Sequence, residues 1–190
     1  MIAHLLTASR MVLAGGFAAG AAATIHQGRL GLASALMLAG LALAEEATDA
    51  LDGIVARRTG TASVIGGVFD PLSDSLSRLA IYFSLALTGC LSIAVPLVMA
   101  GRDIIVAYTR IINAMTGGKT SARLSGKVKA VVQGAGIFLV LGAAWALDPA
   151  LTASVIVRRS CEVILITVTA WSLLDYLHGT FRHARASGKL

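Results

Sequence analysis

The feature that most constrains the fold is a series of six long apolar segments separated by short turn-like stretches. A membrane-spanning helix needs roughly 20 mostly apolar residues, and the segments cover residues 6–25, 30–51, 64–88, 91–115, 130–147 and 160–177. Only 14% of the residues are charged, whereas a soluble domain carries about 25%. The sequence therefore predicts an all-α integral membrane protein with six transmembrane helices in a single domain, residues 1–190.

Lysine and arginine are concentrated in connections that this topology places on one side of the membrane. Nine lie on that side: Arg57, Arg58, Lys119, Arg123, Lys127, Lys129, Arg182, Arg185 and Lys189. Three lie on the other: Arg29, Arg158 and Arg159. Because cytoplasmic loops carry the excess of positive charge, we expect both termini and the basic loops in the cytoplasm of a cell-membrane protein. This orientation accounts for the net charge of +6, so no nucleic-acid partner is expected.

The acidic residues indicate a functional site. Six of the ten fall between residues 45 and 74, namely Glu45, Glu46, Asp49, Asp52, Asp70 and Asp74. Each aspartate pair has a spacing of three or four residues, which places both carboxylates on one face of a helix. The two helices are consecutive, so the pairs can face one another. Four converging carboxylates need cations between them, and all-oxygen ligands suit Mg²⁺ or Mn²⁺. Two such ions are a common arrangement for displacement at phosphorus.

Small and basic residues next to the aspartates fit the same interpretation. Gly53 follows Asp52, and Gly66 lies one turn before Asp70. A glycine there lets a ligand approach the backbone, although close packing of membrane helices would also use it. Arg57 can clamp a diphosphate through its planar guanidinium, or it can simply be a cytoplasmic loop arginine.

These residues form one continuous pattern. It comprises Asp49-x2-Asp52-Gly53-x2-Ala56-Arg57-x8-Gly66-x3-Asp70-x3-Asp74. The pattern resembles the signature of the CDP-alcohol phosphotransferase family at every fixed position, and the resemblance implies that family's six-helix membrane fold.

Further stretches are similar to the bacterial phosphatidylglycerophosphate synthases of that family. They are Leu5-Leu6-Thr7 with Arg10, Asp70-Pro71-Leu72-Ser73-Asp74, Arg102-Asp103, Arg110, and Gly126-Lys127-Val128-Lys129 with Gln133. The chain departs from that branch at Glu45 and Glu46, which replace small apolar residues, and at Ser75, which replaces lysine. Asp103 and Ala130 replace glutamate and threonine.

The resemblance implies a role for each signature residue. Two divalent ions, Mg²⁺ or Mn²⁺, would be held by Asp49, Asp52, Asp70 and Asp74. The CDP group would lie against Asp52, Gly53, Ala56, Arg57 and Gly66. Catalysis would fall to Asp70 and Asp74, with Asp74 as the candidate general base.

The remaining assignments concern the acceptor and the partners. A phosphorylated acceptor would use Arg110 and Lys127 first, and Arg123, Lys129 or Arg10 as further cations. Glu45 and Glu46 would support the metal ligands or face water. The expected partners are a CDP-linked lipid donor, a small alcohol acceptor, the lipid bilayer and a second copy of the chain in a homodimer.

Two alternatives remain at the level of sequence. The acceptor is predicted to be glycerol-3-phosphate, with inositol phosphate, serine or another alcohol as the alternative within the family. A small ion-coupled transporter is the alternative of another class, since intramembrane aspartates also bind coupling ions. A purely structural membrane protein would leave the carboxylates without a purpose.

Overall fold

The computed structural model describes residues 2–25, 30–59, 66–116 and 123–186, and within these ranges it leaves out the side chains of 2–8, 49–50, 52–59, 66–70, 116, 184 and 186. Every regular element in the described residues is an α-helix. The helices are α1 (Ile2–Ala22), α2 (Leu32–Thr59), α3 (Gly66–Leu87), α4 (Ala94–Thr116), α5 (Leu124–Ala146) and α6 (Thr152–Ala186). The prediction of an all-α chain with six helices is confirmed for this part of the chain.

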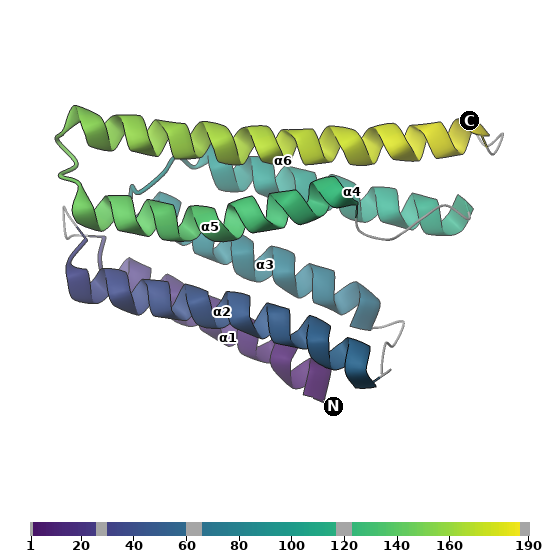
Figure 1. Cartoon of the computed structure of the whole chain (residues 1–190), viewed down its shortest axis with the longest axis horizontal. Helices are drawn as coiled ribbons and strands as arrows, with labels where there is room; N and C mark the ends of the chain where they lie inside the picture. Colours follow the sequence, from purple (N-terminus) through teal and green to yellow (C-terminus); the bar gives the residue numbers. More distant parts are fainter. Residues whose placement is uncertain (1, 26–29, 60–65, 117–122, 187–190) are drawn as a thin grey trace.

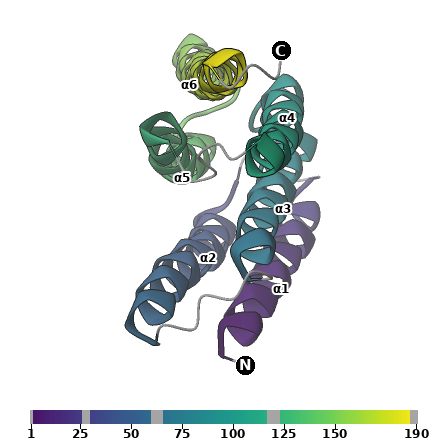
Figure 2. The ribbon, with the colours of Figure 1, turned by 90° about the vertical axis from the view of Figure 1, so that its right-hand side faces the viewer.

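The helices form two groups of three that share an interface. Helix α1 packs against α2 and α3, whereas α6 packs against α4 and α5, and the groups meet where α2 contacts α5 and α3 contacts α4. Figure 1 shows that α1 begins, and α6 finishes, toward the same end of the bundle. We call this the terminal end. The last turns of α2 and α4 and the first turn of α3 also lie toward it (Figure 1), and Figure 2 shows α6 and α1 on opposite sides of the bundle.

Four helices extend four or more residues beyond the predicted segments. Helix α1 begins at Ile2 rather than 6, α2 continues to Thr59 rather than ending at 51, α5 begins at Leu124 rather than 130, and α6 covers Thr152–Ala186 rather than 160–177. The predicted segments cover only the mostly apolar part of each helix, but lysine and arginine are good helix formers. Eight of the basic residues predicted in loops or the tail therefore lie on helices: Arg57, Arg58, Lys127, Lys129, Arg158, Arg159, Arg182 and Arg185.

Helix α3 ends in a glycine cap at Gly89. Gly89 has φ of 78°, a left-handed conformation that glycine adopts without a steric penalty. The Cys90 amide donates to the Leu85 carbonyl and the Gly89 amide to the Ala86 carbonyl, each at 3.0 Å. This pair of bonds is the Schellman motif, and it turns the chain toward α4.

Apolar side chains fill the interior and also cover much of the outside. Six helices contribute to one buried core, which includes Phe17, Leu38, Ile81, Met99, Ile137 and Leu165. Many other large apolar side chains are more than half exposed, among them Leu36, Leu97, Val131, Leu139 and Ile164. Within the described residues one helix, α5, is long and apolar enough by length and composition to cross a membrane. The other five spans stay predictions.

Helices α3, α5 and α6 pack closely together at Gly136 of α5. The Tyr82 hydroxyl of α3 donates to the Gln133 carbonyl of α5 at 2.7 Å, and the Gln133 amide donates to Thr169 of α6 at 2.9 Å. A Cβ at Gly136 would lie 2.7 Å from the Tyr82 hydroxyl and 2.9 Å from a Leu165 methyl group. Only glycine therefore fits this position without displacing Tyr82 or Leu165.

We predict that Gly136→Ala destabilises the bundle. Overpacking costs about 1–3 kcal/mol, which outweighs the roughly 1 kcal/mol that alanine gains over glycine within a helix. Gly142→Ala is the matched control, because a Cβ there meets nothing within 4 Å. Thermal unfolding in detergent should show a lower melting temperature for Gly136→Ala and an equal or higher one for Gly142→Ala. Equal melting temperatures for the two variants would contradict the packing described here.

Candidate functional site

The backbone brings the two helices that carry the predicted metal ligands to one end of the bundle. Asp49 and Asp52 lie in the second half of α2, and Asp70 and Asp74 lie in the first half of α3. The end of α2 and the start of α3 both lie toward the terminal end (Figure 1). The side chain of Asp74 is described, whereas those of the other three are not. The convergence of all four carboxylates therefore stays a prediction, as do the roles of Gly53, Ala56, Arg57 and Gly66, whose surroundings lie outside the described residues.

Asp74 is a partly exposed carboxylate beside two guanidinium groups. Its Oδ1 lies 3.0 Å from Arg78 Nη2 and 3.6 Å from Arg10 Nη2. About a third of the side chain, 31%, remains accessible. Both contacts use the same oxygen, so Oδ2 has no protein partner among the described contacts. Asp74 can therefore be held by the protein through one oxygen and offer the other to a ligand.

Glu45 and Glu46, which depart from the pattern of the phosphatidylglycerophosphate synthases, lie beside Asp74. Glu45 is 1% exposed, receives a hydrogen bond from the Ser77 hydroxyl at 2.6 Å, and lies 3.9 Å from the buried Arg10. Glu46 lies 3.3 Å from Arg78. Its carboxylate also packs over Gly134 of α5, where a Cβ would come within 3.0 Å of it. Glu45 does not face water, and both glutamates support the cations that flank Asp74.

Arg78 connects this group to the rest of the bundle and was not singled out from the sequence. It is almost fully buried, and its Nη1 donates to the Ala130 carbonyl of α5 at 2.9 Å. The sequence does contain a signal, since Arg78 lies four residues after Asp74 and so shares its helix face. We call Arg10, Glu45, Glu46, Asp74 and Arg78 the acidic cluster. It holds three carboxylates and two guanidiniums, a net charge of −1.

A second group of polar side chains lies between α4, α5 and α6, and its net charge is positive, whereas that of the acidic cluster is negative. Asp103 accepts from Arg102 at 2.8 Å and from Lys129 at 3.1 Å. Arg102 also donates to the Ser172 hydroxyl at 2.7 Å. Lys129, considered above as a loop cation, is instead buried on α5, because Asp103 compensates its charge.

The remaining cations of this region gather around one aromatic ring. The guanidinium carbons of Arg102, Arg110 and Arg123 lie 5.1, 5.8 and 5.7 Å from the centroid of Tyr176. We call these four residues the arginine cluster. Of the cations predicted for the acceptor, the structure brings Arg110 and Arg123 together here. Lys127 is exposed on α5 and has no contact among those described, so its role stays a prediction.

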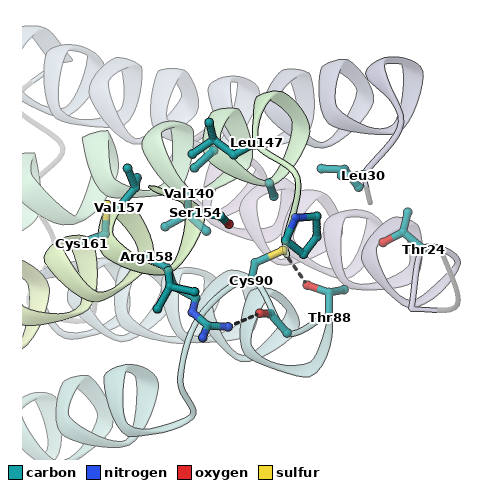
Figure 3. A pocket seen from close by; sticks show the side chains of 15 residues that line it. Thr24, Leu30, Thr88, Cys90, Val140, Leu147, Ser154, Val157, Arg158 and Cys161 are labelled. Atoms are coloured by element: carbon teal, nitrogen blue, oxygen red, sulfur yellow. Dashed lines mark hydrogen bonds between the residues drawn. The ribbon is translucent and has the colours of Figure 1, made fainter. Parts of the chain in front are cut away.

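A cavity at the other end of the molecule is separate from both clusters. It has a volume of about 160 Å³ and lies among the ends of α1, α3 and α5 and the starts of α2 and α6. Figure 3 shows Cys90, Cys161 and Arg158 around it, with Arg158 donating to a backbone carbonyl. No carboxylate lines it. The cavity therefore has none of the predicted site residues and is not the candidate site.

The donor chemistry of the α2–α3 end suits a hard divalent ion. Aspartate oxygens are the ligands that Mg²⁺ and Mn²⁺ prefer, and one oxygen of Asp74 makes no contact with the side chains that the structure describes. Among the described side chains no group of three or more histidines, cysteines, aspartates or glutamates is arranged to hold a metal. The other three predicted ligands are not among those side chains. The residues present fit the metal in chemical type, and metal binding stays a proposal.

We predict that Arg78→Leu strongly destabilises the protein. Removing one partner of a buried ion pair costs about 3–5 kcal/mol, and the partial exposure of Asp74 and Glu46 reduces this to about 2–4 kcal/mol. Adding Glu46→Gln to Arg78→Leu should recover part of the loss, because the orphaned charge is then removed. Chemical denaturation of the two single variants and the double variant measures this coupling. Strict additivity would contradict a direct Arg78–Glu46 interaction.

The chain is similar to known proteins along most of its length. Residues 1–174 match the family model described as CDP-alcohol phosphatidyltransferase. The chain is 29% identical over 150 residues to a CDP-diacylglycerol–glycerol-3-phosphate 3-phosphatidyltransferase of Pseudomonas fluorescens, covering 75% of this chain and 74% of that protein. It is 39% identical over 87 residues to an archaetidylinositol phosphate synthase of Pyrococcus horikoshii, covering 45% and 46%. The family match extends from the N-terminus through most of α6, and the chain belongs to the CDP-alcohol phosphatidyltransferase family of enzymes.

Proposed function

We propose that this enzyme transfers the phosphatidyl group of CDP-diacylglycerol to glycerol-3-phosphate, giving phosphatidylglycerophosphate and CMP. The observation that carries the proposal is Arg110. It lies in a cluster of three guanidiniums and has no carboxylate among its described contacts. Arg102 and Arg123, in contrast, each pair with an aspartate. An acceptor that bears its own phosphate would supply the missing negative charge.

The names of the relatives support a phosphorylated acceptor. The bacterial relative is named for glycerol-3-phosphate and matches along three quarters of both chains. The archaeal relative is named for an inositol phosphate product and matches less than half of either chain. Glycerol-3-phosphate is therefore the first choice, and inositol phosphate is the alternative. The family match removes the transporter and the purely structural protein from consideration.

The residues of the proposed site take distinct roles. Asp49, Asp52, Asp70 and Asp74 hold two divalent ions, which neutralise the diphosphate and polarise the phosphorus under attack when bound. The CDP group lies against Asp52, Gly53, Ala56, Arg57 and Gly66. Asp74 is positioned by Arg10 and Arg78 and is the candidate acceptor of the hydroxyl proton. The acceptor oxygen then bonds to the lipid-bearing phosphorus as the bond from that phosphorus to CMP breaks.

The exposed apolar surface supports a membrane location for this chemistry. Contiguous exposed apolar surface on a soluble monomer is unusual, and the helices expose many leucines, isoleucines and valines. We propose that the six helices cross the membrane with both termini and the site on the cytoplasmic side, where the lysines and arginines are concentrated. We also propose a homodimer, which exposed small residues on these helices would permit.

We predict that the purified protein releases CMP from CDP-diacylglycerol only with a phosphorylated acceptor and Mg²⁺ or Mn²⁺. The assay offers glycerol-3-phosphate, inositol phosphate, inositol and serine in turn. Release with glycerol-3-phosphate alone, abolished by chelator and by Asp70→Asn, is the expected result. Release with inositol phosphate alone would replace the acceptor by the alternative. Release with serine or inositol would contradict a phosphate-binding acceptor site.

We further predict that Arg110→Gln raises the KM for glycerol-3-phosphate. A hydrogen bond to a charged group contributes about 1.5–3 kcal/mol, which corresponds to roughly 10- to 100-fold in affinity. The KM for CDP-diacylglycerol should stay unchanged. Arg182→Gln is the matched control, since Arg182 lies exposed on α6 toward the same end. An equal effect of Arg110→Gln on both substrates would show that Arg110 acts on the fold and does not bind the acceptor.

A further inference from the structure

Tyr176 occupies the centre of the arginine cluster and is not one of the residues that the family pattern singles out. It lies on α6 with 3% of its surface exposed. Arg102 and Arg110 approach its ring from α4, and Arg123 approaches from the residue just before α5. All three guanidinium carbons lie within the distance of about 6 Å at which a cation is attracted to an aromatic ring.

Besides these contacts with the ring, the hydroxyl of Tyr176 accepts hydrogen bonds from two of the arginines. It accepts a hydrogen bond from the backbone amide of Arg123 at 3.0 Å and a longer one from Arg110 Nη2 at 3.4 Å. The first bond holds the chain just before the first turn of α5, and the second holds a side chain from α4. One hydroxyl group therefore sets the position of Arg110 relative to Arg123.

Two glycines make the room that this arrangement needs. A Cβ at Gly126 would lie 3.1 Å from the Tyr176 hydroxyl and 3.6 Å from an Arg102 nitrogen. A Cβ at Gly179, one turn after Tyr176 on α6, would fall on the guanidinium of Arg123. The lack of a side chain at Gly126 of α5 leaves space for Tyr176, and the lack of one at Gly179 of α6 leaves space for Arg123.

Two of the three arginines pair with a carboxylate, whereas the third contacts only an aromatic residue among the contacts described, and this difference affects which of them can bind an anion. Arg102 pairs with Asp103 and Arg123 pairs with Asp175 at 3.1 Å. The described contacts of Arg110 are with Tyr176 alone. A carboxylate would hold Arg110 but would also neutralise it. An aromatic ring and a neutral hydroxyl hold it and leave its charge available.

We propose that Tyr176 is a positioning residue that holds Arg110 and Arg123 in place for the phosphate group of the acceptor. This inference rests on the proposed function, because it assigns the arginine cluster to the acceptor. Tyr176 acts through the two arginines and does not itself react. A tyrosine that only packs α6 against α4 and α5 would affect stability and would not act selectively on one substrate.

The test compares Tyr176→Phe with Tyr82→Phe in CMP-release kinetics. Both tyrosines are buried and both lose a hydroxyl hydrogen bond, but Tyr82 bonds to a backbone carbonyl away from the arginine cluster. We expect Tyr176→Phe to raise the KM for glycerol-3-phosphate roughly 5- to 20-fold, the equivalent of one or two hydrogen bonds. The kcat and the KM for CDP-diacylglycerol should change less than twofold. Tyr82→Phe should lower the melting temperature and leave both KM values unchanged.

A binding measurement separates this proposal from the proposed function. Inorganic phosphate is titrated into each detergent-solubilised variant, without donor or metal, by isothermal titration calorimetry. Weaker phosphate binding by Tyr176→Phe than by wild type and Tyr82→Phe supports the positioning role, even if no tested acceptor gives CMP. Gly179→Ala should weaken phosphate binding as well, because it displaces Arg123.

Two outcomes would overturn the inference. The first is an unchanged acceptor KM in Tyr176→Phe when the wild type is active. The second is equal phosphate affinity in wild type and Tyr176→Phe. Either result would leave the family chemistry intact, whereas a wild type that releases no CMP with any phosphorylated acceptor would contradict the proposed function and not the role of Tyr176.

Discussion

The structure depends on the compensation of charge inside a largely apolar bundle. A charged group that leaves water costs several kcal/mol unless a partner and hydrogen bonds replace the solvent. Arg78 meets this requirement through Asp74, Glu46 and the Ala130 carbonyl. These contacts join α3 to α2 and α5, so the two groups of three helices are tied together at the cluster that contains the candidate catalytic carboxylate. Stability and the geometry of the site are therefore coupled.

The two polar clusters divide the proposed reaction between the two helix groups. The carboxylates of the acidic cluster lie on α2 and α3, and the cations of the arginine cluster lie on α4 and at the start of α5. The two clusters are linked through α5, where the Ala130 carbonyl accepts from Arg78 and the adjacent Lys129 pairs with Asp103. A metal-bound diphosphate and a phosphorylated acceptor would thus approach from opposite sides of one interface. This separation would keep the proposed metal ligands from pairing with the proposed acceptor cations.

The features that depend on neighbouring residues along the chain, such as the helices and the aspartate spacing, could be predicted from the sequence. The contacts between side chains of different helices could not. The helices follow from apolar length, and the aspartate spacing led to the family. The limits of α5 were wrong because Lys129 was interpreted as a loop residue, whereas Asp103 allows it to be buried on the helix. The roles of Arg78 and Tyr176 were missed for the same reason. Arg78 does share a helix face with Asp74, but its contact with the Ala130 carbonyl and the contact of Tyr176 with Arg123 join residues more than 50 positions apart, and no local pattern encodes such pairs.

The central claim is that the α2 and α3 aspartates form one site for two divalent ions. The most direct measurement is electron paramagnetic resonance of Mn²⁺ titrated into the detergent-solubilised protein with CDP-diacylglycerol and no acceptor. The account predicts two bound Mn²⁺ ions per chain with a spectrum broadened by spin coupling, and loss of the coupled signal in Asp49→Asn and in Asp70→Asn, which lie on different helices. A single uncoupled ion, or binding that is unchanged in either variant, would contradict a shared two-metal site.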